Sequence, residues 1–196
     1  MGELHEYTLK GKSLKLKKAI IFFISCVIAY IISRIIPIIE EIVQISLWWI
    51  EIPSIVGVYT GIDKIIDKYF WSKFYGIPYL EGEWEGYIKS SFDNYVNKIP
   101  IIRCVIKQNS KMISIVFEMN QSKSYSINAI MDFSKINGIT LEYKYINIPN
   151  IEENETLNVH FGENKFTIKD NELEGEYFNK QRATNGKIYL KKKEEI

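Results

Sequence analysis

Two apolar runs near the N-terminus constrain this chain of 196 residues more than any other feature. Residues 19–33 carry no charged side chain, and the run resumes after Arg34; residues 42–62 carry one charge, Glu51. A helix needs about 20 apolar residues to cross the hydrocarbon core of a bilayer, so both runs are long enough. A signal peptide is the alternative for the first run, but no small-residue cleavage site follows it. We therefore predict a two-helix transmembrane hairpin over residues 19–62, with its turn at residues 37–41.

Lysines flank the predicted hairpin on both sides and orient it. Five precede the first run and three follow the second, which by the positive-inside rule places both termini in the cytoplasm. Residues 1–18 are then a basic cytoplasmic tail, and the acidic turn lies outside. The heavy use of Ile, Lys and Asn suggests a bacterial genome, so we expect a multi-pass protein of the bacterial inner membrane. These lysines are Lys10, Lys12, Lys15, Lys17, Lys18, Lys64, Lys68 and Lys73.

Four residues of the predicted hairpin are candidates for membrane assembly. Glu51 lies near the middle of the second run, where an ionised carboxylate is costly and usually turns away from lipid. It either pairs with Tyr30 or Arg34 inside the hairpin or belongs to a polar seam that forms when several hairpins meet. Gly57 and Gly61 are four residues apart, a spacing that lets helix backbones approach closely but that also occurs by chance.

Residues 63–78 form a predicted juxtamembrane segment. The apolar side chains from Ile62 to Phe70 recur at helical spacing, which indicates the end of a helix or a short interfacial helix. Gly76 and Pro78 end it and mark the boundary before residues 79–196.

The remainder of the chain is predicted to be all-β. Short runs rich in β-branched and aromatic residues are separated by turn residues, and connections this short favour up-and-down pairing. We expect an eight- to nine-stranded antiparallel barrel, lipocalin-like, which leaves no exposed edge; a sandwich is the alternative. The predicted strands cover residues 83–91, 101–108, 112–119, 123–131, 139–147, 156–161, 165–169, 172–179 and 186–191.

Strand alternation predicts which side chains face the barrel interior. Several inward faces begin apolar or small and end polar, at Ser90, Gln108, Asn147 and Asn179. This pattern indicates one plugged end and one polar mouth able to hold a small ligand, although strand ends that simply meet solvent would look similar. The predicted inward residues include Trp84, Gly86, Ile88, Ile102, Cys104, Ile106, Leu141, Tyr143, Tyr145, Leu173, Gly175, Tyr177, Gly186, Ile188 and Leu190.

No recognisable catalytic or metal-binding motif is present. The sequence has no glycine-rich phosphate loop, CxxC, HExxH or GxSxG, and its histidines are His5 and His160. Its net charge of +1 gives no basic field for DNA or RNA. The two cysteines, one in the first apolar run, suggest a reducing compartment rather than a disulfide. We predict a non-enzyme without a metal or cofactor.

Several motifs, taken together in order and spacing, resemble one known family. Nearly the whole chain is similar to the SMODS-associated two-transmembrane, β-strand-rich effectors of CBASS anti-phage systems. The segments that carry the resemblance are 82–86 (GEWEG), 90–91 (SS), 106–108 (IKQ), 122–126 (SKSYS), 141–147 (LEYKYIN), 160–162 (HFG), 173–178 (LEGEYF) and 186–188 (GKI), with Arg182.

The resemblance implies a cytoplasmic barrel that binds a cyclic dinucleotide made by a cognate cyclase after phage infection. Binding is implied to drive homo-oligomerisation of the hairpins, disruption of the lipid bilayer and abortive cell death. The ligand-binding residues that it implies are Ser90, Ser91, Gln108, Ser122, Ser124, Tyr143, Tyr145, Asn147, His160, Tyr177 and Arg182.

Structural roles remain open for some of these residues. Trp84 with Arg182 resembles the lipocalin floor pair, in which an arginine packs on a first-strand tryptophan. Two other functions remain open for the whole chain. One is a membrane-tethered carrier of a lipid or other apolar ligand, and the other is a structural anchor whose plugged barrel binds no small ligand.

Overall fold

The computed structural model describes residues 2–44, 55–134, 136, 138–150 and 159–194. The chain divides into two compact units, residues 13–77 and a second unit made of residues 1–12 and 78–196. The first unit is helical and the second is a β-barrel.

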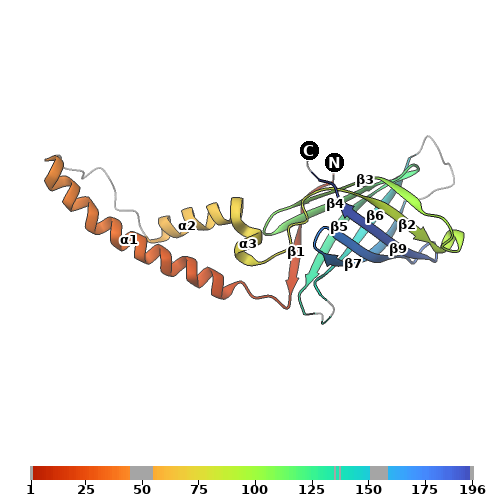
Figure 1. The fold of residues 1–196 in the computed structure, drawn as a ribbon, viewed down its shortest axis with the longest axis horizontal. Coiled ribbons are helices and arrows are strands. Elements are labelled where there is room, and N and C mark those ends of the chain that lie inside the picture. Colours follow the sequence, from red (N-terminus) through yellow and green to blue (C-terminus); the bar gives the residue numbers. More distant parts are fainter. Residues whose placement is uncertain (1, 45–54, 135, 137, 151–158, 195–196) are drawn as a thin grey trace. The chain divides into compact units, whose positions relative to one another are not determined.

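The long helix α1 (Lys15–Val43) dominates the helical unit (Figure 1). At 1.5 Å per residue, its 29 residues extend about 44 Å, more than the thickness of a hydrocarbon core. Within the part of the chain that the structure describes, α1 is the one helix long and apolar enough to cross a membrane.

The turn predicted at residues 37–41 is wrong, because α1 continues through it. Pro37 lies inside the helix, and the helix ends at Val43, where Gln44 adopts a left-handed conformation and its N–H donates to the Glu40 carbonyl at 2.9 Å. A proline removes one helical hydrogen bond, but the apolar residues on both sides of Pro37 remain helical. Most of the second predicted span, Glu51 included, lies outside the described residues, so a two-helix hairpin is not found.

The chain re-enters the described structure as α2 (Ile55–Ile65), continues as one π-helical turn (Ile66–Phe70) and ends as α3 (Trp71–Tyr75). Gly76 stops α3 in a left-handed conformation, as the sequence predicts. α2 packs on α1: Phe22 meets Tyr59 edge to face at 6.4 Å, and Lys18 forms an ion pair with Asp63. Gly61 is exposed, and a β-carbon added to it would meet no atom within 4 Å.

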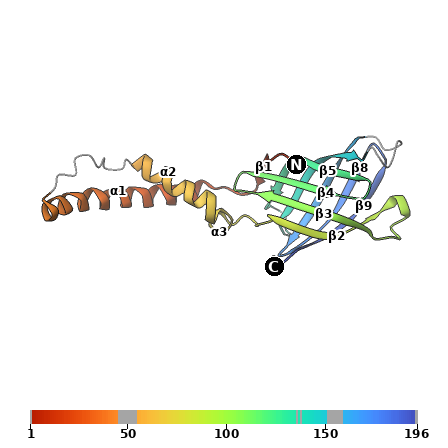
Figure 2. The same ribbon diagram turned by 90° about the horizontal axis from the view of Figure 1, so that it is seen from above.

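Eight strands form an up-and-down barrel in which each strand pairs with the next and β9 closes on β2 (Figure 2). The alternation of apolar and polar residues along each strand explains the closure, since a closed sheet buries one face and leaves no edge. The strands are β2 (Gly82–Ser90), β3 (Ile99–Gln108), β4 (Met112–Glu118), β5 (Ser122–Asp132), β6 (Thr140–Pro149), β7 (His160–Lys169), β8 (Glu172–Asn179) and β9 (Thr184–Lys192).

A ninth strand, β1 (His5–Lys10), comes from the segment predicted to be a basic tail. β4 and β5 pair only near their shared turn, up to Val116 and Tyr125, and β5 then shifts its register against β6 between Ser126 and Asn128. β1 fills the gap, antiparallel to β4 and parallel to β5, so the barrel is not wholly antiparallel. His5 Nε2 lies 2.7 Å from Ser126 Oγ across this seam.

β7 joins two segments that the sequence analysis predicted as separate strands. The expected break at residues 162–164 does not exist, because Gly162 serves close packing instead of a turn. A β-carbon there would lie 2.3 Å from the Tyr145 ring on the neighbouring strand β6. Glycine inside a strand often marks such a close approach.

The core follows the predicted inward faces with one exception. Trp84, Cys104 and Leu141 are fully buried, whereas Ile102 is exposed and its neighbour Ile101 is buried. An irregularity opposite the Trp84–Gly86 segment places an extra residue in β3, so the alternation changes phase there.

Candidate ligand-binding cavity

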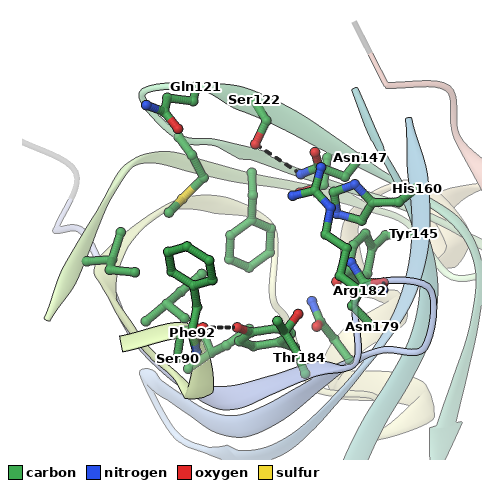
Figure 3. Close-up of a pocket in the computed structure, with 18 of the residues that line it drawn as sticks. Ser90, Phe92, Gln121, Ser122, Tyr145, Asn147, His160, Asn179, Arg182 and Thr184 are labelled. Carbon is green, nitrogen blue, oxygen red and sulfur yellow. Dashed lines mark hydrogen bonds between the residues drawn. The ribbon is translucent and has the colours of Figure 1, made fainter. Parts of the chain in front are cut away.

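A cavity of about 990 Å³ opens at the end of the barrel where β2, β6 and β8 finish (Figure 3). Protein sites for small molecules commonly enclose about 300–1,000 Å³. The space is therefore large enough for an organic ligand of nucleotide size, and the barrel is not plugged along its whole length.

The polar mouth forms because strands that run in the same direction end together. Ser90, Asn147 and Asn179 finish β2, β6 and β8, and all three line the cavity. The prediction that Gln108 shares this mouth is wrong, because β3 is antiparallel to β2 and ends at the opposite rim. There Gln108 Oε1 accepts a hydrogen bond of 2.8 Å from the Leu80 N–H.

Two tyrosine rings shape the cavity walls. Tyr145 lies over Gly162, and Tyr177 lies over Gly186, where an added β-carbon would come within 2.3 Å of either ring. The Tyr177 hydroxyl shares a hydrogen bond of 2.5 Å with Ser90 Oγ. The two glycines therefore let both rings lie close to the barrel wall and keep the space in front of them open.

The charge of the cavity suits an anion. Among the described lining residues, Arg182 carries the one permanent positive charge, and none is Asp or Glu. Figure 3 shows the Arg182 guanidinium at the mouth near Asn147 and His160. The backbone N–H of Arg182 donates to Asn179 Oδ1 at 3.1 Å and stabilises the turn that contains Arg182. Burial raises the pKa of Tyr145 to about 12, so its hydroxyl stays protonated beside Arg182 at neutral pH.

Most of the predicted ligand-binding residues come together in the cavity. Tyr143 and Ser91 do not line it: Tyr143 packs below, where its hydroxyl accepts from Asn164 Nδ2 at 2.5 Å, and Ser91 Oγ accepts from the Asn185 N–H. Gln108 lies at the other rim. The predicted residues that line the cavity are Ser90, Ser122, Ser124, Tyr145, Asn147, His160, Tyr177 and Arg182.

The predicted floor pair of Trp84 with Arg182 does not form. Trp84 is buried at the opposite end of the barrel, where its Nε1 donates to the Leu80 carbonyl at 2.9 Å. Arg182 lies in the turn before β9, and β9 must run the full length of the barrel before it reaches Trp84. The cation nearest that ring is instead Lys192, whose Nζ lies 5.9 Å from the ring centroid.

Several lining residues were not among the predicted candidates. Asn164 was placed in a turn that does not exist, although its spacing from His160 fits an inward position on a strand. Phe92 projects from a short helical turn after β2, which strand alternation cannot predict. The missed residues that line the cavity include Phe92, Phe117, Asn164, Gln181 and Thr184.

Across the described ranges, no cluster of three or more His, Cys, Asp or Glu side chains is placed to hold a metal ion. Hydroxyl, amide, aromatic and guanidinium groups dominate the cavity instead.

Comparison with known proteins assigns the barrel to a family. A search among curated proteins returns no significant match. The family described as "Cap15, cyclic dinucleotide receptor domain" matches residues 75–192, more than half of the chain. The match confirms the predicted resemblance for the receptor barrel of a CBASS effector and not for the SMODS association or the two-transmembrane part. A cyclic dinucleotide is the ligand that the family implies. A barrel with a polar, carboxylate-poor mouth and this match over eight of its strands lead to one conclusion: the chain belongs to the Cap15 cyclic dinucleotide receptor domain family.

Proposed function

We propose that a cyclic dinucleotide messenger binds in the cavity at the barrel mouth and switches on the chain as a membrane effector of bacterial anti-phage signalling. The observation that carries the proposal is the described lining, which offers aromatic faces, hydroxyls, amides and a guanidinium and contains no carboxylate. A filled barrel, which the structural-anchor alternative requires, does not fit a cavity of about 990 Å³.

The chemistry of the ligand matches these groups. A cyclic dinucleotide carries two anionic phosphodiesters, which favour guanidinium and hydroxyl donors. Arg182 and the hydroxyls of Ser122 and Thr184 supply such donors at the mouth. Its two bases favour aromatic faces, and a good stack is worth about 1–3 kcal/mol, so Tyr145 and Tyr177 are the proposed stacking partners.

The effector part of the proposal concerns the helical unit. The length and apolar character of α1 support insertion in a bilayer, and we propose that the residues after it complete a two-pass anchor with both termini inside. Arg34 and Gly61 are exposed in the single chain, and no atom lies within 4 Å of a β-carbon added at Gly61, so we propose these positions and Gly57 for contact with a neighbouring copy. Messenger binding then promotes homo-oligomerisation and disruption of the inner membrane. The ligand must bind the assembled state more tightly than the resting one, because otherwise it shifts nothing.

Calorimetry on the full chain in lipid nanodiscs tests the receptor step. We expect saturable binding of at least one member of a panel of cyclic dinucleotides. Arg182→Gln should weaken it about tenfold or more, because hydrogen bonds to charged groups are worth about 1.5–3 kcal/mol. Lys180→Gln is the matched control, since Lys180 carries the same charge in the same turn, is exposed and is not among the lining residues. Failure of every ligand to bind the folded chain would overturn the proposal.

Dye release from liposomes tests the effector step. Vesicles that contain the chain should leak when the bound messenger is added and should stay intact with Arg182→Gln at the same concentration. If the messenger binds but causes neither leakage nor a change in oligomeric state, the receptor part of the proposal stands and the membrane-disrupting part is refuted.

A further inference from the structure

Phe92 is an aromatic side chain that the fold leaves almost entirely in water at the entrance of the cavity. It is 86% exposed and nevertheless lines the cavity, which it reaches from the short helical turn Ser91–Asp93 after β2. Single exposed apolar side chains are common on protein surfaces, so exposure alone indicates no function. The position of Phe92 distinguishes it from such residues, because a ligand that fills the entrance would cover its ring.

The backbone that carries the Phe92 ring is held in place by hydrogen bonds. The Phe92 N–H donates to Ser90 Oγ at 3.1 Å, and the Tyr95 N–H donates to the Ser90 carbonyl at 2.8 Å. The turn is also bound to the start of β9, because the Asn185 N–H donates to Ser91 Oγ at 3.0 Å and the Tyr95 hydroxyl donates to Asn185 Oδ1. A ring on such a backbone loses little conformational freedom when a ligand covers it, which favours binding.

The cavity lining has two chemically different sides. Figure 3 shows Phe92 across the cavity from Asn147, His160 and Arg182. An anionic group of a ligand is therefore favoured on the Arg182 side, and a flat apolar group is favoured on the Phe92 side. The lining residues from the turn after β2, from β3 and from residues 117–119 are all apolar: Phe92, Ile99, Pro100, Phe117 and Met119.

A cyclic dinucleotide has a matching division, with phosphodiesters in its ring and flat bases that project from it. When a phosphodiester accepts hydrogen bonds from Arg182, a base can extend toward the apolar side. Bases stack on aromatic rings, but the ring must have an accessible face. Phe117 is buried, whereas Phe92 is exposed, so Phe92 is the aromatic side chain of the apolar side that can take a base.

We propose that Phe92 is a further ligand-contacting residue, which stacks on one base of the messenger and caps the cavity over it. This inference rests on the proposed binding of a cyclic dinucleotide in the same cavity, and it adds Phe92 to the proposed stacking partners Tyr145 and Tyr177. Because every base has a flat face, Phe92 contributes affinity and residence time and leaves the choice of base to other residues.

Binding kinetics and calorimetry on the full chain in nanodiscs test the contact. The probes are cyclic di-AMP, cyclic di-GMP and cyclic GMP–AMP, of which the one that binds most tightly is used. Phe92→Ala should weaken binding about tenfold through the loss of one stack, and most of the change should be faster dissociation. Phe92→Tyr and Phe92→Trp keep a flat ring and should bind within about twofold of the wild type, whereas Phe92→Leu is apolar without a flat ring and should bind about fivefold more weakly.

Two controls separate ligand contact from an effect on folding. The Phe92 variants should keep the wild-type melting temperature, because the ring is exposed and contributes little to the packed core. Phe178→Ala is the matched control: Phe178 is 59% exposed and lies on β8 between the lining residues Tyr177 and Asn179, but it does not itself line the cavity. This variant should bind the probe as the wild type does.

The outcomes distinguish this inference from the proposed function. Unchanged affinity and dissociation in Phe92→Ala overturn the role of Phe92 and leave the receptor function standing. Wild-type binding by Phe92→Leu overturns stacking, because any apolar side chain would then suffice. An equal loss in Phe92→Ala and Phe178→Ala, or a lower melting temperature in Phe92→Ala, overturns a local contact with the ligand. If no cyclic dinucleotide binds the folded wild-type chain, the proposed function fails and this inference fails with it.

Discussion

Gly162→Ala should damage the cavity from the wall of the barrel. The added β-carbon would lie 2.3 Å from Cζ and from Oη of Tyr145, where ordinary contacts begin at 3.4 Å. The Tyr145 ring must therefore move by about 1 Å, and the open side available to it is the cavity that it lines. The substitution should thus reduce both stability and ligand affinity.

The size of the effect follows from two opposing contributions. Crowding one methyl group into a packed site typically costs about 1–3 kcal/mol. Replacing a strand glycine by alanine returns about 0.5–1 kcal/mol of conformational entropy. We expect the free energy of unfolding to fall by about 1–2 kcal/mol.

Denaturant unfolding of the full chain in detergent, followed by circular dichroism, measures this loss. In a Tyr145→Ala background the same Gly162→Ala change should be neutral or slightly stabilising, because the ring that it strikes is gone. Calorimetry with the bound messenger should show weaker binding for Gly162→Ala alone. Equal destabilisation in both backgrounds, or an unchanged affinity in the single variant, would refute the reasoning.

Three further predictions follow from burial and open space. Burial raises the pKa of Tyr7 and of Tyr145 to about 12 from 10, so both phenols stay protonated in the folded chain where the unfolded chain ionises. The free energy of unfolding should therefore be constant below pH 10 and fall as the pH rises toward 12. Denaturation midpoints measured across this range test the prediction, and a midpoint that does not change with pH would contradict it. Gly61→Leu should leave folding intact, because space surrounds Gly61, and should block close helix approach; crosslinked oligomers that form as in the wild type would count against a role in assembly. Cys104 is fully buried, and burial raises its pKa, so maleimide should label it only after unfolding; mass spectrometry of the labelled peptide decides, and rapid labelling of the folded chain would show that the core opens.

The alternation of apolar and polar residues along the sequence was sufficient to predict much of the barrel. Alternation correctly predicts the inward faces of β6, β8 and β9, including Leu141, Tyr145 and Leu173, because burial on one face of a strand imposes a period of two on the sequence. It fails at Ile102, where an extra residue changes the phase, since a bulge leaves no mark on composition.

Long-range contacts account for the other errors. β1 looks like a basic tail until the separation of β4 and β5 creates a place for a strand. Gly162 looks like a turn until Tyr145 is seen against it. The sequence alone does not show whether a glycine forms a turn or allows close packing, because the residue that packs against it, here Tyr145 against Gly162, is distant in the chain.

The sequence by itself determined the long apolar N-terminal helix, the barrel class, the family and the side-chain chemistry of the mouth, because these depend on composition and local order. Only the tertiary structure decided which polar strand ends share a rim. Arg182 lies at the cavity end of the barrel, whereas Gln108 and Trp84 lie at the opposite end, because antiparallel neighbours finish at opposite ends. The tertiary structure also brought Asn164 to the cavity lining and against the Tyr143 hydroxyl, since the partners of a polar side chain depend on residues that only folding brings together.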